Sequence, residues 1–195
     1  MAATALPLAP RVRGRNLLVA TGFAIAATVM YFAGLFGIYF QQRAQARDAG
    51  LEWIPGDAVL DLAAPGMIMW TLLISVAVVQ WAVYSIARDD RPHALLAIGA
   101  TLAMGAMVLV LAARQFTQMG LIADRDISSV LVYTISGSHV VMVLIAMTFV
   151  ALMGFRALAG QYSSRQTDGI VAAAMFWDAA VFIYFFLWIG VYIAK

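Results

Sequence analysis

SVLVYTISGSHVVMVLIAMTFVALMGFR, residues 129–156, is an apolar stretch long enough to cross a lipid bilayer as one helix. An α-helix rises about 1.5 Å per residue, so about 20 residues span a hydrocarbon core about 30 Å thick. His139 lies near the middle of this stretch. An ionisable side chain inside hydrocarbon is costly unless it is paired or functional, so His139 is a candidate site residue.

A second apolar run, residues 169–194, follows closely and contains one acid in its interior, Asp178. In two antiparallel helices, His139 would lie roughly 15 Å from one membrane face and Asp178 roughly 13 Å from the other. The two depths nearly coincide, so a buried imidazole–carboxylate pair is geometrically possible. We favour a polar contact that fixes helix packing, because a proton relay needs further acids at membrane depth. A relay or ligand site is the alternative.

The composition places the whole chain in the membrane. Of its 195 residues, 64% are hydrophobic and 11% charged, whereas about a quarter of the residues in a soluble domain are charged. The expected fold is all-α, with one five-helix transmembrane domain at residues 17–195 after a basic N-terminal segment at residues 1–16. The first run is too long for a signal-peptide core and predicts an uncleaved helix. The expected spans are residues 17–40, 66–87, 93–119, 129–156 and 169–194.

The basic residues favour one orientation. With the N-terminus inside, seven arginines lie in the inner segments and five basic residues in the outer ones. The inner set is Arg11, Arg13, Arg15, Arg88, Arg91, Arg156 and Arg165; the outer set is Arg43, Arg47, Arg114, Arg125 and Lys195. We therefore expect the N-terminus inside and the C-terminus outside.

Several classes of chemistry are excluded by what the chain lacks. Without cysteine it cannot form disulfides, thiolate zinc sites, iron–sulfur clusters or covalent haem links. Two histidines, His93 and His139, are too few for a haem or copper site. No phosphate-binding loop, dinucleotide fingerprint, Ser–His–Asp arrangement or HExxH motif occurs, and the scattered arginines exclude a nucleic-acid surface. We expect no catalytic residue, metal ligand or cofactor in this chain, which suggests an accessory subunit.

Small residues recur four positions apart in the first and third expected helices. Such pairs let helix backbones approach closely in lipid. The candidate packing residues are Gly22, Ala26, Ala33, Gly37, Gly99 and Ala103.

Four stretches occur together in one order and spacing. They are MYFAGLFGIYFQQRA (30–44), WIPGDAVLDLAAP with MWTLLIS (53–65 and 69–75), SGSHVVMVLIAMTFVALMGFRALAG (136–160) and AAMFWDAAVFIYFFLWIGVYI (173–193). In order, they resemble the first helix, the proline-bearing loop with the next helix, the glycine–histidine–valine helix and the last helix of bacterial cytochrome c oxidase subunit III. The resemblance covers about residues 20–195.

This resemblance implies a non-catalytic component of an aerobic respiratory haem–copper terminal oxidase in a bacterial plasma membrane. It implies packing against subunit I and other subunits, phospholipids held between the helices, and support for assembly and sustained proton-coupled electron transfer to oxygen. Haem and copper would belong to the partner subunits. Bacterial oxidases use the five-helix form with its N-terminus inside.

Several positions depart from the usual pattern of the family; among them, the third helix ends with Arg114 and Gln115 in place of the usual acidic residues. Thr28 stands where the first helix usually carries glutamate, and Asp178 and Val181 stand where the last helix usually carries histidine and aspartate. His139 is the polar family feature that this sequence keeps. Roles ascribed to the missing acids are therefore not expected here.

Two alternatives remain open from sequence. One is a subunit III-like partner of a quinol oxidase or a nitric oxide reductase. The other is a small independent proton or solute transporter that uses His139 and Asp178. The transporter is less favoured because the chain has no inverted repeat and no series of intramembrane acids.

Overall fold

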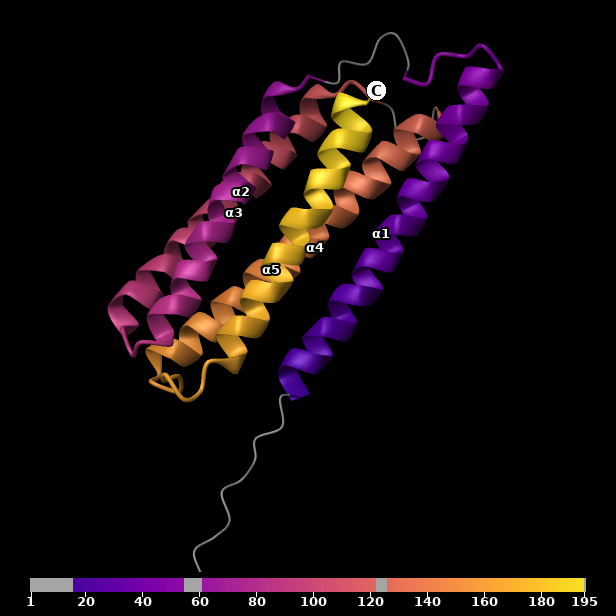
Figure 1. Cartoon of the computed structure of the whole chain (residues 1–195). Coiled ribbons are helices and arrows are strands. Elements are labelled where there is room, and N and C mark those ends of the chain that lie inside the picture. Colours follow the sequence, from indigo (N-terminus) through magenta and orange to yellow (C-terminus); the bar gives the residue numbers. More distant parts are fainter. Residues whose placement is uncertain (1–15, 55–60, 122–125, 195) are drawn as a thin grey trace, which may run out of the picture.

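A computed structural model describes residues 16–54, 61–121 and 126–194. Five long helices form an antiparallel bundle (Figure 1): α1 (Asn16–Asp48), α2 (Ala63–Ile86), α3 (Arg91–Gln118), α4 (Ile127–Leu158) and α5 (Asp168–Leu187). α5 continues into a π-helical turn, η1 (Trp188–Ile193). The described ranges contain no strand, so the all-α fold with five apolar helices is confirmed. Residues 1–15 of the expected basic segment lie outside the described residues.

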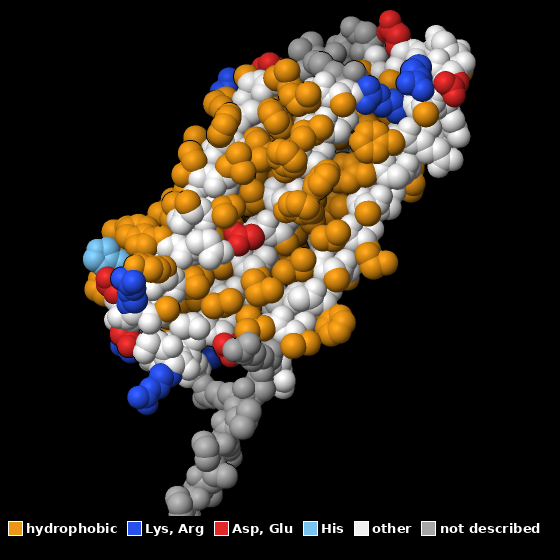
Figure 2. Space-filling view, in the orientation of Figure 1, with side chains coloured by type: hydrophobic (Ala, Val, Ile, Leu, Met, Phe, Trp, Pro, Cys, Tyr) orange, Lys and Arg blue, Asp and Glu red, His pale blue; other side chains and the backbone are white. Residues whose placement is uncertain are grey.

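All five spans are long and apolar enough to cross a membrane. Figure 2 shows hydrophobic side chains covering most of one face of the bundle, with most of its charged groups towards the two ends. α1 differs from the expected span because it continues past residue 40 to Asp48. The added residues, QQRAQARD, are mostly good helix formers, so the helix persists after its apolar run ends. The end of an apolar run marks where a chain leaves hydrocarbon, not where its helix ends.

α5 lies at the centre of the bundle. It packs against α1, α2 and α4, while α3 packs against α2 and α4. Its largest buried side chain is Trp177, whose indole Nε1 donates a hydrogen bond of 2.8 Å to Ser75 Oγ on α2. This bond satisfies both polar groups away from lipid and ties the central helix to its neighbour.

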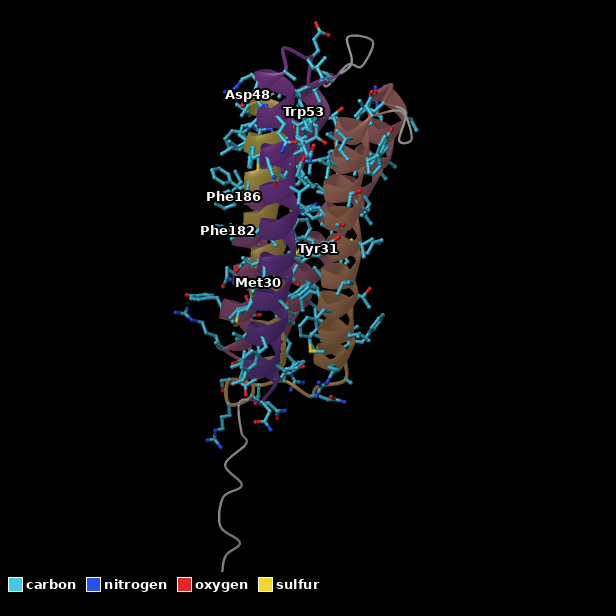
Figure 3. All side chains as sticks on the ribbon, turned by 90° about the vertical axis from the view of Figure 1, so that its right-hand side faces the viewer. Met30, Tyr31, Asp48, Trp53, Phe182 and Phe186 are labelled. Atoms are coloured by element: carbon cyan, nitrogen blue, oxygen red, sulfur yellow. The ribbon has the colours of Figure 1, made fainter. Side chains whose placement is uncertain are left out.

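α1 lies at the edge of the bundle and contacts α4 and α5 (Figure 1). Tyr31 points from α1 towards α4 (Figure 3), and its hydroxyl lies 2.8 Å from Ser138 Oγ. Near the other end of α1, Tyr39 is fully buried and packs edge-on against Trp53, at 5.3 Å between ring centroids. A few aromatic contacts thus hold an otherwise exposed helix.

Two short connections meet at the end of the bundle where α2 turns into α3. Asp90 caps α3 by accepting a hydrogen bond from the His93 amide at 3.3 Å. Asp89 adopts a left-handed backbone, with φ of 61°, and its Oδ1 accepts a 2.7 Å hydrogen bond from the Ser164 amide. The α2–α3 turn is therefore joined to the α4–α5 loop.

Close packing of α3 against its neighbours uses two glycines outside the predicted packing pairs. A Cβ atom on Gly105 of α3 would lie 2.9 Å from Met147 and from Trp177. A Cβ atom on Gly154 of α4 would lie 2.9 Å from Ile98. Glycine at these two positions lets α3 approach α4 and α5 without a steric clash.

The six small residues expected to pack helices lie elsewhere. A Cβ atom on Gly22, Gly37 or Gly99 would have none of the described neighbours within 4 Å. Ala26, Ala33 and Ala103 are exposed. Within this chain these pairs therefore do not bring helices close together, because their faces point away from the neighbouring helices. Contact with another subunit remains a prediction for them.

Candidate functional site

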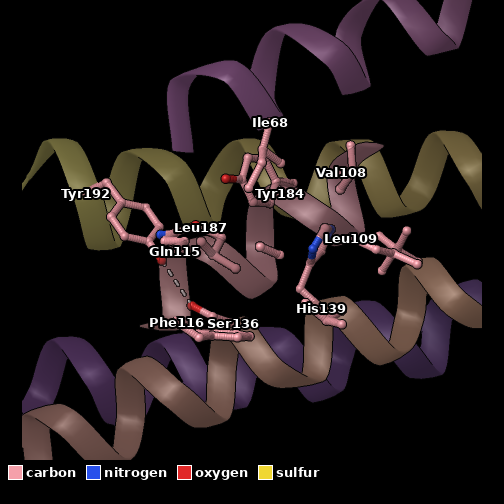
Figure 4. Close-up of a pocket in the computed structure, with 13 residues that line it drawn as sticks. Ile68, Val108, Leu109, Gln115, Phe116, Ser136, His139, Tyr184, Leu187 and Tyr192 are labelled. Atoms are coloured by element: carbon pink, nitrogen blue, oxygen red, sulfur yellow. Dashed lines mark hydrogen bonds between the residues drawn. The ribbon is translucent and has the colours of Figure 1, made fainter. Parts of the chain in front are cut away.

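His139 is buried in α4 and faces α5 (Figure 4). Its Nε2 lies 3.0 Å from the carbonyl oxygen of Ala180, and its ring centroid lies 4.9 Å from that of Tyr184. A carbonyl oxygen only accepts hydrogen bonds, so Nε2 carries the proton and Nδ1 is the acceptor of the neutral ring. The side chain thus joins the last two helices.

Asp178 does not pair with His139. Its Oδ2 accepts a hydrogen bond of 2.6 Å from Gln80 Nε2 on α2. Asp178 lies at nearly the same depth as His139, because Ala180, which bonds His139, is only about 3 Å along the axis of α5 from Asp178. However, residues two apart are separated by about 200° around an α-helix, so Asp178 and Ala180 face opposite neighbours. The structure therefore does not bring His139 and Asp178 together, and a proton relay through this pair has no geometric basis.

A small cavity lies beside His139 (Figure 4), with a volume of about 20 Å³ accessible to the centre of a water molecule. One water molecule needs at least roughly 10–15 Å³ by this measure. The polar residues in its lining are Gln115, Ser136, His139, Tyr184 and Tyr192. The cavity therefore suits a single water and is too small for an organic substrate.

Hydrogen bonds around this cavity join several helices. Ser136 Oγ on α4 lies 3.2 Å from the Tyr192 hydroxyl on η1, and Tyr184 on α5 donates to the Pro65 carbonyl on α2 at 3.2 Å. Gln115 Nε2 on α3 is buried without a hydrogen-bond partner among the described atoms. A water in the cavity is the kind of group that satisfies such an amide. The hydrogen bonds around the cavity thus join α4 to η1 and α5 to α2.

Across the described ranges, no group of three or more histidine, cysteine, aspartate or glutamate residues is placed to hold a metal ion. Gln80 was not among the predicted polar residues, because only ionisable side chains within the spans were candidates. A glutamine inside an apolar run was the available signal, since an amide in lipid also needs a partner.

Comparison with known proteins places the chain in a family. The family described as "Cytochrome c oxidase subunit III" matches residues 12–195. The chain belongs to this family. Subunit 3 of cytochrome c oxidase from Neotragus moschatus, Sus scrofa and Bos taurus is 28% identical to it over 171 residues. These matches cover 86% of this chain and 66% of each relative, so the chain spans about two thirds of their length.

Membership of the subunit III family confirms the resemblance seen in the sequence. With its five apolar helices, this subunit III family member is a multi-pass membrane protein. Three departures from the family pattern make contacts within the bundle. Thr28 donates a hydrogen bond to the Ala24 carbonyl within α1 at 2.8 Å, Val181 is buried, and Asp178 is held by Gln80.

Proposed function

We propose that the chain is the non-catalytic subunit III of a haem–copper terminal oxidase. In this role it packs against subunit I, while haem and copper belong to the partner subunits. It supports assembly of the complex and sustained proton-coupled electron transfer to oxygen. The observation that carries the proposal is the family match over residues 12–195. Several polar side chains of the bundle agree with it, because they join helices to one another.

Lipid binding is supported by a groove between α1 and α5. It has a volume of about 440 Å³ and only apolar lining residues: Val29, Phe32, Ala33, Phe36, Gly37, Phe40, Phe182, Ile183 and Phe186. Figure 3 shows Phe182 and Phe186 on this side of the molecule. Such a groove suits an acyl chain, because it offers apolar contact without any hydrogen-bonding group. Ala33 and Gly37 were expected to pack against another helix. They line this groove instead, and their small side chains leave space in it.

We further propose a bacterial plasma membrane with the N-terminus inside. The odd number of helices puts the start of α1 and the end of η1 at opposite ends of the bundle (Figure 1), and the basic residues favour N-terminus inside. The chain has no cysteine, so single cysteines can report its sidedness. In intact spheroplasts a membrane-impermeant maleimide should label Leu51→Cys, but Ser164→Cys only after permeabilisation. The reverse pattern would reject this orientation.

The function is tested by purifying the complex through an affinity tag on this chain. We expect haem absorption bands and a copper-bearing partner in the purified material, and neither in a preparation from untagged membranes. Activity assays then distinguish three types of complex: one that oxidises cytochrome c, one that oxidises quinol and one that reduces nitric oxide. A stable tagged chain with no haem protein attached would refute the proposal.

A further inference from the structure

Gln80 and Asp178 form a polar patch on the outer surface of the bundle, within its membrane-spanning part. Gln80 is exposed on α2 and Asp178 is half-buried on α5, with 2.6 Å between Nε2 and Oδ2. Asp178 is ten residues into α5, roughly 15 Å from the start of that helix. Figure 2 shows acidic atoms part-way along the otherwise apolar face over α2 and α5.

This patch is not satisfied by the chain itself. Asp178 Oδ1 is enclosed by the chain and has no hydrogen-bond partner among the described atoms, and the exposed Gln80 side chain makes no second hydrogen bond with them. Lipid tails cannot supply one, and a carboxyl or amide group facing hydrocarbon is destabilising. The exposed Gln80 amide keeps an unpaired oxygen as well as a second N–H, and a hydrogen-bond donor complements that oxygen. A cationic donor would also neutralise the carboxylate.

We propose that the Gln80–Asp178 patch docks a transmembrane helix of another oxidase subunit through a donor side chain, with lysine or arginine fitting best. This inference rests on the proposed function. It places a contact between subunits on the α2–α5 face and gives it a polar anchor. Hydrogen bonds between helices in membranes provide both stability and register.

The surroundings of the patch suit a helix. Exposed apolar residues flank it at helical spacing, with Leu73 and Ala77 on α2, and Met175 and Phe182 on α5. Ala77 is small and adjacent to the patch, which allows a partner backbone to come close. A second copy of this chain fits poorly, because a two-fold contact would bring one Asp178 against the other.

The proposal is tested in the assembled complex with a photo-reactive amino acid. It is placed at Ala77 or Met175, beside the patch, and as a control at Val141, which is 55% exposed on α4. After irradiation, mass spectrometry should identify, from the first two positions only, an adduct with a transmembrane helix of another subunit that carries a donor residue. These chains keep both patch residues, so the result does not depend on a variant that fails to fold.

The polar anchor is tested separately by Gln80→Leu and Asp178→Leu in the Met175 photo-reactive chain. We expect the adduct yield to fall roughly three- to tenfold, as for loss of one hydrogen bond between helices. Thr148→Val is the matched control, since Thr148 is exposed on α4 and bonds only to its own helix. Its yield should not change.

The outcomes separate the two proposals. If haem subunits purify with the chain but the adducts contain only lipid or a second copy, the docking inference is overturned and the function stands. Unchanged yields in both leucine variants would also overturn the polar anchor. If no haem subunit purifies with the unaltered chain, the proposed function fails, and the identity of the partner fails with it.

Discussion

α5 and α1 are both apolar spans, yet their surroundings differ greatly. The last span comprises α5 and η1. In an apolar 18-residue window of this span 67% of the residues are buried within the chain, whereas in the corresponding window of α1 only 11% are buried. The polar groups of α5 meet two other helices: Trp177, Asp178 and Tyr184 bond to α2, and the Ala180 carbonyl bonds to α4. On α1, Thr28 bonds to its own helix and Tyr31 reaches α4. Apolar composition thus predicts that a helix spans a membrane, but not what it contacts.

The largest expected difference between these helices comes from removing an aromatic ring. Trp177→Ala should lower the free energy of unfolding by about 3–5 kcal/mol, because it leaves a cavity and removes the donor to Ser75. Phe23→Ala on α1, where Phe23 is 73% exposed, should change it by less than about 0.5 kcal/mol. Unfolding in mild detergent measures both. Equal losses would contradict a central α5 and a peripheral α1.

A second prediction concerns the approach of α3 to α5. Gly105→Ala should destabilise the bundle by about 1–3 kcal/mol, since the added methyl group would meet Met147 and Trp177 at 2.9 Å. Gly99→Ala is the control on the same helix, where the space is open. It should be neutral or stabilise by up to about 1 kcal/mol. Unfolding midpoints of the two variants provide the measurement, and a destabilising Gly99→Ala would argue against this packing.

A third prediction tests whether His139 acts in packing. His139→Leu should cost about 1–2 kcal/mol, because it removes the donor to the Ala180 carbonyl while keeping most of the buried volume. In the assembled oxidase, turnover per haem should be unchanged. Thr134→Val, exposed on the same helix with a hydroxyl bonded only to Val130, is the control. Lost turnover in a fully assembled, stable His139→Leu complex would show that the histidine takes part in proton transfer.

The groove between α1 and α5 gives a prediction with little effect on stability. Gly37→Leu should fill part of the groove and reduce the phospholipid bound per complex, measured by mass spectrometry of the extracted lipids. Gly22→Leu is the control on α1, since Gly22 lies outside the groove and also has open space. The same lipid content in both variants would mean that the groove holds no lipid.

The smallest expected effect concerns pH at the loop that leads into α5. Hydrogen bonds from Ser164, from its side chain and then its amide, hold the pKa of Asp89 below its usual value of 3.8. The carboxylate therefore contributes stability above that value, which is lost as pH falls through the lower pKa of the folded state. Asp89→Asn keeps the acceptor and tolerates the positive φ, so its stability should depend less on pH in this range. Identical acid titrations of the two proteins would contradict this.

Much of the fold could be predicted from sequence because bilayer thickness sets a length that an apolar run must meet. All five helices were expected, and the main difference was α1, which extends past its apolar run to Asp48. The site was harder to predict. His139 was selected correctly as a buried polar residue, but its partner is a backbone carbonyl, which a search for complementary side chains cannot reveal.

The sequence by itself determined the class of this protein, its five spans and its family, because hydropathy, length and the order of short motifs are properties of the chain alone. Only the tertiary structure decided which polar groups meet. Depth along a helix follows from residue counting, whereas the direction of a side chain depends on how each helix is rotated against its neighbours. That rotation turns Asp178 towards Gln80 and leaves His139 against Ala180, and it leaves Gly105 rather than Gly99 at a close contact.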